Sequence, residues 1–234
     1  MLRNGVFAFQ TIRGSTSAGM AYCIFQTNEK SFRIFTGSGG QHVPDYPLGL
    51  PGQIKGVIFE HWDQVDEMPK DCKWVAYGMD FGFSADPTAL VKVALSGGDL
   101  WLDELIYHRG LTNQDIAKWM GELGLRWVDE VIADNQPKCI YEIKKEGFNV
   151  VATFKGKDSI LVGIDIMKRY NFHITKRSGN LIREFKNYKW KEDQSGKATN
   201  EPIDRFNHGI DAVRYVCLAK VMVNRKRMVK VGRC

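Results

Sequence analysis

The sequence predicts an α/β fold with a mixed sheet, in which an antiparallel meander is followed by parallel strands flanked by helices. The first observation is the alternation of apolar with small or polar residues over 74–80, which is typical of a strand packed on a core. The second is the pair of β-forming segments that follows, with Gly97-Gly98 as the turn between them. The third is the alternation of helical and strand patterns after residue 112, which favours crossover connections.

The 234 residues suit one sizeable domain plus an appendage, and a hydrophobic fraction of 44% is enough for a core. Residues 1–51 are expected to form an N-terminal appendage or linker remnant. No G-x-x-x-x-G-K-[ST] occurs, so no ATPase P-loop is expected. Residues 52–223 form the predicted main domain, and residues 224–234 are a basic tail that we expect to be frayed.

Each element follows from a local pattern. Thr112 is a candidate N-cap, Pro137 suits the first turn of a helix that ends at Gly147, and Asp204 is expected to cap a last helix from Arg205 to about Val221. A polar segment around Gly196 indicates an exposed hairpin or loop over 188–202. The predicted strands are 57–65, 74–80, 88–95, 100–107, 128–133, 149–154 and 172–175, and the other predicted helices start near 113, 158 and 181.

Composition narrows the function classes only partly. The net charge of +6 and pI of about 9.0 are compatible with a polyanionic partner such as nucleic acid, although many enzymes with neutral substrates reach the same balance. The five cysteines are scattered and form no C-x-x-C pair, so neither a disulfide framework nor a zinc site is indicated. A reduced intracellular setting is therefore the default expectation. No apolar run of about 18 residues occurs, so no transmembrane helix is predicted, and no signal-peptide pattern is present.

Three aspartates stand where they can meet. Asp80 ends the predicted strand 74–80, Asp134 follows the predicted strand 128–133, and Asp211 lies on the last helix one turn after His208. These two strands can be neighbours in such a sheet, and a helix across their edge can add the third acid. Clustered carboxylates repel one another unless a counter-ion is present, and Mg²⁺ or Mn²⁺ takes oxygen ligands. Two such ions about 3.5–4 Å apart can stabilise both the attacking and the leaving oxygen when a phosphodiester is hydrolysed.

Simpler readings exist for each of these residues. A single aspartate after a strand is usually a turn or cap residue, which is how we interpret Asp86, Asp115, Asp158, Asp165 and Asp204. His208 alone reads as a surface histidine, but beside Asp211 it can orient water or complete a metal shell. Lys155 and Lys157 read as a solvated turn, or as phosphate ligands if they border an active edge. Glu104 is a weak candidate for the acidic cluster.

Four segments carry a resemblance to a known family. Gly56–Phe83, Ile132–Ile143, Phe154–Lys168 and Asn207–Tyr215 resemble, in the same order, motifs of the nuclease half of the large terminase subunit of tailed bacteriophages. The resemblance covers roughly residues 52–222. It implies a ribonuclease H-like fold and a metal-dependent DNA endonuclease that cuts concatemeric viral DNA during genome packaging.

The resemblance also implies a site. Asp80, Asp134 and Asp211 would bind two divalent ions, Mg²⁺ or Mn²⁺, with His208 as an auxiliary catalytic residue. The 188–202 segment resembles a hairpin that controls DNA access near the active site. The lysines expected to bind DNA are Lys155, Lys157, Lys189, Lys191 and Lys197.

The resemblance further implies double-stranded DNA, the small terminase subunit and the portal protein as partners, no membrane, and the bacterial host cytoplasm as location. We expect the isolated domain to be monomeric. Two departures stand out. The family's second motif more often reads A-D-S-A-E-P, whereas this chain has Ala133-Asp134-Asn135-Gln136-Pro137 and so lacks the glutamate. The family's ATPase half is also absent from these 234 residues.

Two alternatives stay open. The chain could be a non-catalytic or degenerate DNA-binding and packaging-assembly module that lacks its ATPase motor, with the acids as remnants. A phosphotransferase is suggested by the D-F-G of Asp80-Phe81-Gly82, but no H-R-D-L-x-x-x-N motif and no Gly-rich loop with a strand lysine accompany it.

Overall fold

The structure is a computed structural model that describes residues 56–82, 85–153, 156 and 158–231, with side chains up to residue 220, and the backbone of three strands nearer the N-terminus. The chain divides into two compact units, Met1–Gln53 and Ile54–Cys234. In the first unit, β1 (Tyr22–Asn28), β2 (Ser31–Thr36) and β3 (Tyr46–Pro47) pair antiparallel in that order. None of the helices described is long and apolar enough to cross a membrane.

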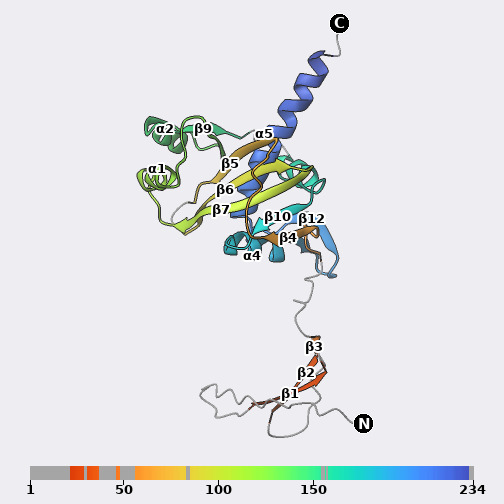
Figure 1. Cartoon of the computed structure of the whole chain (residues 1–234). Coiled ribbons are helices and arrows are strands. Elements are labelled where there is room, and N and C mark those ends of the chain that lie inside the picture. The colour runs from red at the N-terminus through yellow and green to blue at the C-terminus, as the bar shows by residue number, and fades with distance from the viewer. Residues whose placement is uncertain are drawn as a thin grey trace. The chain divides into compact units, whose positions relative to one another are not determined.

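The second unit is built on a seven-stranded mixed sheet (Figure 1). The pairs β5–β6 and β6–β7 are antiparallel and the other pairs are parallel. The predicted mixed sheet is therefore confirmed, and the predicted strands 74–80 and 128–133, now β5 and β8, are neighbours. The strand order is β4 (Trp62–Val65), β10 (Phe172–Thr175), β7 (Asp99–Arg109), β6 (Pro87–Ser96), β5 (Trp74–Asp80), β8 (Glu130–Ala133) and β9 (Asn149–Ala152).

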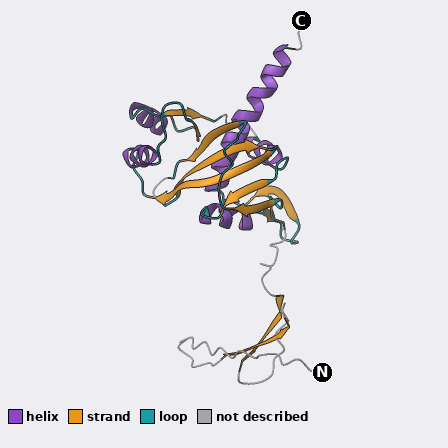
Figure 2. Cartoon of the chain, in the orientation of Figure 1, coloured by secondary structure: helices purple, strands orange, loops and turns teal. Residues whose placement is uncertain are grey.

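Helices cover both faces of this sheet (Figure 2). Successive strand residues point to opposite faces, so β5 contributes to two separate cores. Met79 packs in the core that contains α1 (Asn113–Glu122) and α2 (Pro137–Lys145). Ala76 packs in the other core, with side chains of α3 (Ser159–Met167), α4 (Gly179–Asn187) and α5 (His208–Val231). The even-numbered residues of β5, Asp80 included, therefore belong to the α5 side of the sheet.

Local signals set several element boundaries as predicted. The Thr112 hydroxyl accepts a hydrogen bond from the Asp115 amide at 3.1 Å, and the Asp115 carboxylate accepts one from the Thr112 amide at 2.9 Å. This reciprocal capping box satisfies two amides that the helix itself leaves unpaired. Pro137 occupies the first turn of α2, where its missing N–H costs nothing. The polar 188–202 segment is a hairpin of β11 (Trp190–Glu192) and β12 (Ala198–Pro202).

Three segments differ most from the sequence prediction. The strand expected over 57–65 is confined to β4, because Ile58 instead donates its amide to the Tyr188 carbonyl at 2.9 Å and packs in the core. The last helix begins at His208 and not at Arg205, so Asp204 as its cap is wrong. The reason is Phe206, whose φ of 57° is left-handed and interrupts any right-handed turn there. Since α5 runs to Val231, residues 224–231 of the expected frayed tail are helical.

Candidate active site

Asp80 and Asp134 follow neighbouring parallel strands. The last register pair of β5 and β8 is Met79 with Ala133, so the two aspartates come next on each strand. The Asp134 amide donates to the Met79 carbonyl at 3.1 Å, which carries the pairing one step further. The Asp134 carboxylate accepts hydrogen bonds from the Asn135 amide at 2.8 Å and from the Gln136 side chain at 3.4 Å. Both acids therefore lie at the carboxyl-terminal edge of the β5–β8 pair.

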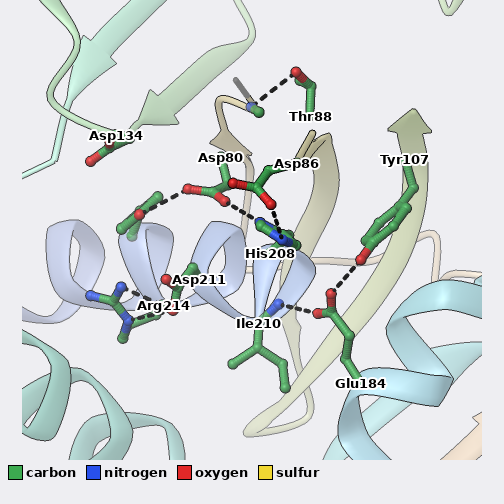
Figure 3. A network of polar contacts seen from close by, with 12 residues as sticks. Asp80, Asp86, Thr88, Tyr107, Asp134, Glu184, His208, Ile210, Asp211 and Arg214 are labelled. Atoms are coloured by element: carbon green, nitrogen blue, oxygen red, sulfur yellow. Dashed lines mark hydrogen bonds and ion pairs between the residues drawn. The ribbon is translucent and has the colours of Figure 1, made fainter. Parts of the chain in front are cut away.

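The helix that carries Asp211 approaches the sheet closely at Gly78. A Cβ atom on Gly78 would lie 1.9 Å from the carbonyl oxygen of Ala212 and 2.5 Å from its carbonyl carbon. Only glycine allows this approach, because both contacts are with backbone. Gly78 and Asp80 share one face of β5, and Asp211 precedes Ala212 in α5. The close approach thus brings Asp211 to the side of the sheet on which Asp80 lies (Figure 3).

Asp211 is a buried acid with a cationic neighbour. Arg214, one turn further along α5, places its Nε at 3.1 Å and its Nη2 at 3.0 Å from Oδ1 of Asp211. Burial raises the pKa of Asp211 to about 6; Arg214 acts to lower it, and the charge of Asp80 adds to the rise. Gly163 of α3 makes room for Arg214, since a Cβ there would lie 2.4 Å from Arg214 Cγ.

Asp80 is held by two side chains of α5 (Figure 3). His208 Nδ1 lies 3.1 Å from Asp80 Oδ2, and the Tyr215 hydroxyl donates to Asp80 Oδ1 at 3.0 Å. The hydrogen bond to Asp80 raises the pKa of His208, which favours the protonated, donating imidazole. Burial raises the pKa of Tyr215, and the charges of Asp80, Asp211 and Asp134 raise it further. Tyr215 therefore interacts electrostatically with all three aspartates.

A comparison with protein-family models identifies the family of this chain. The model described as the terminase RNase H-like domain matches residues 80–218, which is more than half of the chain and contains all three aspartates. The chain belongs to the terminase RNase H-like domain family. The resemblance noted from the sequence motifs is therefore confirmed.

Relatives of this terminase-family chain are terminase large subunits. That of Bacillus phage SPP1 is 27% identical over 148 residues, which cover 60% of this chain and 35% of that protein. The PBSX phage terminase large subunit of Bacillus subtilis (strain 168) is 25% identical over 142 residues, which cover 59% and 33%. The chain thus spans about a third of the length of the curated relatives that it matches.

Solved terminase structures share the fold. The nuclease domain of the bacteriophage SPP1 large terminase, determined with bound Mn, has a TM-score of 0.60 and 24% identity, covering 68% of this chain and 96% of that one. The large terminase nuclease domain of P22 has a TM-score of 0.54 and 17% identity, covering 71% and 93%. The large terminase of a thermophilic bacteriophage has a TM-score of 0.57 and 20% identity, covering 76% and 48%. The ribonuclease H-like fold expected from the motifs is confirmed.

The donor set of this terminase domain fits a hard divalent cation. Among the described residues, no three His, Cys, Asp or Glu side chains are already gathered as a metal cluster. The acids nevertheless offer only carboxylate oxygens, which Mg²⁺ and Mn²⁺ prefer. Each carboxylate oxygen has two lone pairs, so Asp80 can keep its bonds from His208 and Tyr215 and still bind a cation. A cation would also relieve the repulsion that Asp80 exerts on buried Asp211.

Three neighbours of the candidate site were not foreseen from the sequence. Arg214 and Tyr215 lie three and four residues after Asp211, so helical spacing from that acid could have indicated both. Glu184 on α4 carried no such signal. Its carboxylate is fully buried and accepts hydrogen bonds from the Tyr107 hydroxyl at 2.8 Å and the Ile210 amide at 2.9 Å (Figure 3). Burial raises the pKa of Glu184 to about 7. It ties the first turn of α5 to α4.

The remaining candidates are dispersed. Lys155 and Lys157 lie outside the described residues. In the β11–β12 hairpin, Lys189 pairs with Glu192 at 2.9 Å and Lys191 pairs with Glu201 at 3.2 Å, while Lys197 donates its backbone amide to Asp193. Glu104 does not join the acidic cluster. It accepts hydrogen bonds from the Asn180 side chain and the Leu181 amide, both at 2.7 Å, and so anchors the start of α4.

Proposed function

We propose that this chain is a metal-dependent DNA endonuclease of the phage large terminase type, which cuts concatemeric viral DNA during genome packaging by two-metal phosphodiester hydrolysis. The observation that carries the proposal is the position of Asp80 and Asp134 at adjacent strand ends beside buried Asp211. Membership of the terminase family supports it, as does the fold shared with a terminase nuclease domain determined with bound Mn. In this proposal, residues 52–223 are the nuclease domain.

Each side chain has a role in this mechanism. Asp80, Asp134 and Asp211 would hold two Mg²⁺ or Mn²⁺ ions, which supply Lewis-acid stabilisation and a nucleophilic water of lowered pKa when bound. His208 and Tyr215 fix the Asp80 carboxylate through its two oxygens. Arg214 balances the buried charge of Asp211 from the side of Oδ1.

DNA binding and partners complete the proposal. Lys155, Lys157, Lys189, Lys191 and Lys197 would contact the phosphate backbone; Lys189 and Lys191 would exchange their exposed glutamate partners for phosphates. Exposed ion pairs contribute little stability, so this exchange is inexpensive. The partners we propose are double-stranded DNA, the small terminase subunit and the portal protein, in the host cytoplasm.

A second candidate function is a non-catalytic DNA-binding or packaging-assembly module. One observation favours it: within the described residues, no metal cluster is already assembled. In that case the aspartates would be remnants, and the chain would retain DNA without cutting it.

Plasmid nicking separates the two functions. Supercoiled plasmid is incubated with the chain and Mn²⁺, with EDTA as the blank, and relaxed product is measured on a gel. We expect nicking that Asp80→Asn abolishes, because the amide keeps the shape of the side chain but removes the anionic charge. Asp71→Asn is the matched control. Asp71 is exposed and lies just before the start of β5, whereas Asp80 is the last residue of that strand. DNA retained in EDTA but not cut in Mn²⁺ would favour the non-catalytic module.

A further inference from the structure

The segment that leads into α5 holds an aromatic residue in an unusual backbone conformation. Phe206 is half-buried, lies two residues before His208 and has a φ of 57°. The left-handed region is costly for a bulky residue, and such strain collects at functional sites. His208 contacts Asp80, so Phe206 lies two residues along the chain from a side chain that touches a proposed catalytic acid.

Two guanidinium groups flank the Phe206 ring. The guanidinium carbon of Arg183 lies 5.9 Å from the ring centroid, and that of Arg205 lies 5.8 Å from it. Both arginines are exposed, and neither forms an ion pair with any residue that the structure describes. This differs from Arg177 and Arg214, which are bound to Asp103 and Asp211. Two positive charges are thus gathered on one ring, and no carboxylate among the described residues pairs with either.

We propose that Arg183, Phe206 and Arg205 form a phosphate clamp, which binds the backbone of the DNA strand next to the phosphate that is cut. The proposal rests on the nuclease function proposed above. A guanidinium presents a planar fork of N–H donors that matches phosphate oxygens, and stacking on an aromatic ring leaves that fork exposed. Phe206 holds both forks in place before DNA arrives, which reduces the entropy lost on binding.

The first turn of α5 does not provide this anion site itself. Helix amino termini often bind phosphate through exposed amides. Here the buried carboxyl group of Glu184 already accepts the hydrogen bond of the Ile210 amide, so the terminus has an internal acceptor. A phosphate that approaches the proposed active site from this side therefore meets arginine side chains and not helix amides.

The test measures DNA binding without cleavage. The full chain is titrated into a fluorescent duplex of about 30 bp in EDTA, and anisotropy is followed over a series of salt concentrations. We expect R183A/R205A to weaken binding about 10- to 100-fold at low salt and to reduce the slope of log K against log salt by about 2, one unit for each lost phosphate contact. Arg126→Ala is the control. Arg126 is exposed and lies just before the start of β8, whereas Asp134 follows the end of that strand.

A further variant tests the ring. Phe206→Gly keeps both charges and permits the left-handed φ without strain, so binding should weaken by less than in the double arginine variant. The clamp would be overturned if R183A/R205A bound DNA with the affinity and salt slope of the wild type. Weaker binding with an unchanged salt slope would also overturn it, because that result indicates contacts with bases and not with phosphates. Either result leaves the nuclease proposal intact if the wild type nicks plasmid. A wild-type chain that neither binds nor nicks DNA overturns both.

Discussion

The close approach of α5 to β5 makes Gly78→Ala the sharpest perturbation of this domain. The added Cβ would begin 1.9 Å from the Ala212 carbonyl oxygen, whereas ordinary contact starts at 3.4 Å. Strand and helix would therefore have to separate by about 1.5 Å, because the opposing atoms belong to the backbone and cannot rotate away. The displaced helix carries Asp211, His208 and Tyr215, so stability and activity should both fall.

The expected magnitudes follow from that displacement. Overpacking a core typically costs about 1–3 kcal/mol, and a contact between two backbones belongs at the upper end, near 3 kcal/mol. A misplacement of about 1 Å in a catalytic group can lower the rate about 100-fold. We expect urea denaturation to show the loss in unfolding free energy, and the Mn²⁺ nicking assay to show the loss in rate.

The matched control is Gly121→Ala in α1. There the nearest atom to a new Cβ is Phe148 Cζ at 3.9 Å, which is comfortable contact. Alanine is favoured over glycine inside a helix by about 1 kcal/mol, so this variant should be as stable as wild type or more so. If Gly78→Ala kept wild-type stability and nicking, the packing of α5 on Gly78 could not be what positions the acids.

Two further predictions concern the neighbours of the acids. Because the pKa of Glu184 is raised to about 7 from 4.5, the folded state keeps a proton that the unfolded state has lost, and this group destabilises the protein as pH rises through that interval. The amide of Glu184→Gln does not titrate. The unfolding free energy of this variant relative to wild type should therefore rise by on the order of 2 kcal/mol as pH increases from about 5 to about 8, measured by urea denaturation. A difference that does not change with pH would contradict this. Tyr215→Phe removes the donor to Asp80 Oδ1 but keeps the ring, so nicking should fall about 10-fold, equivalent to about 1.4 kcal/mol. An unchanged nicking rate would show that Tyr215 does not hold Asp80 in its working position.

Much of the fold could be predicted from the sequence, because its signals are local. Alternating residues define β5, the Thr112–Asp115 pair defines the start of α1, and Pro137 defines the start of α2. The order of strands and crossovers then places β5 beside β8, which is why Asp80 and Asp134 could be paired from the sequence alone. Periodicity and chain connectivity are properties of neighbouring residues.

The sequence by itself determined the strands, most helix starts and the acids at the strand ends. Only the tertiary structure decided where α5 begins, how closely it approaches Gly78, and that Glu184 lies beneath its first turn. It also decided the raised pKa values of Asp211 and Glu184, which follow from burial. The physical reason is that burial and close packing depend on groups far apart in the chain, and no local pattern reports which distant side chain or backbone atom will become the neighbour.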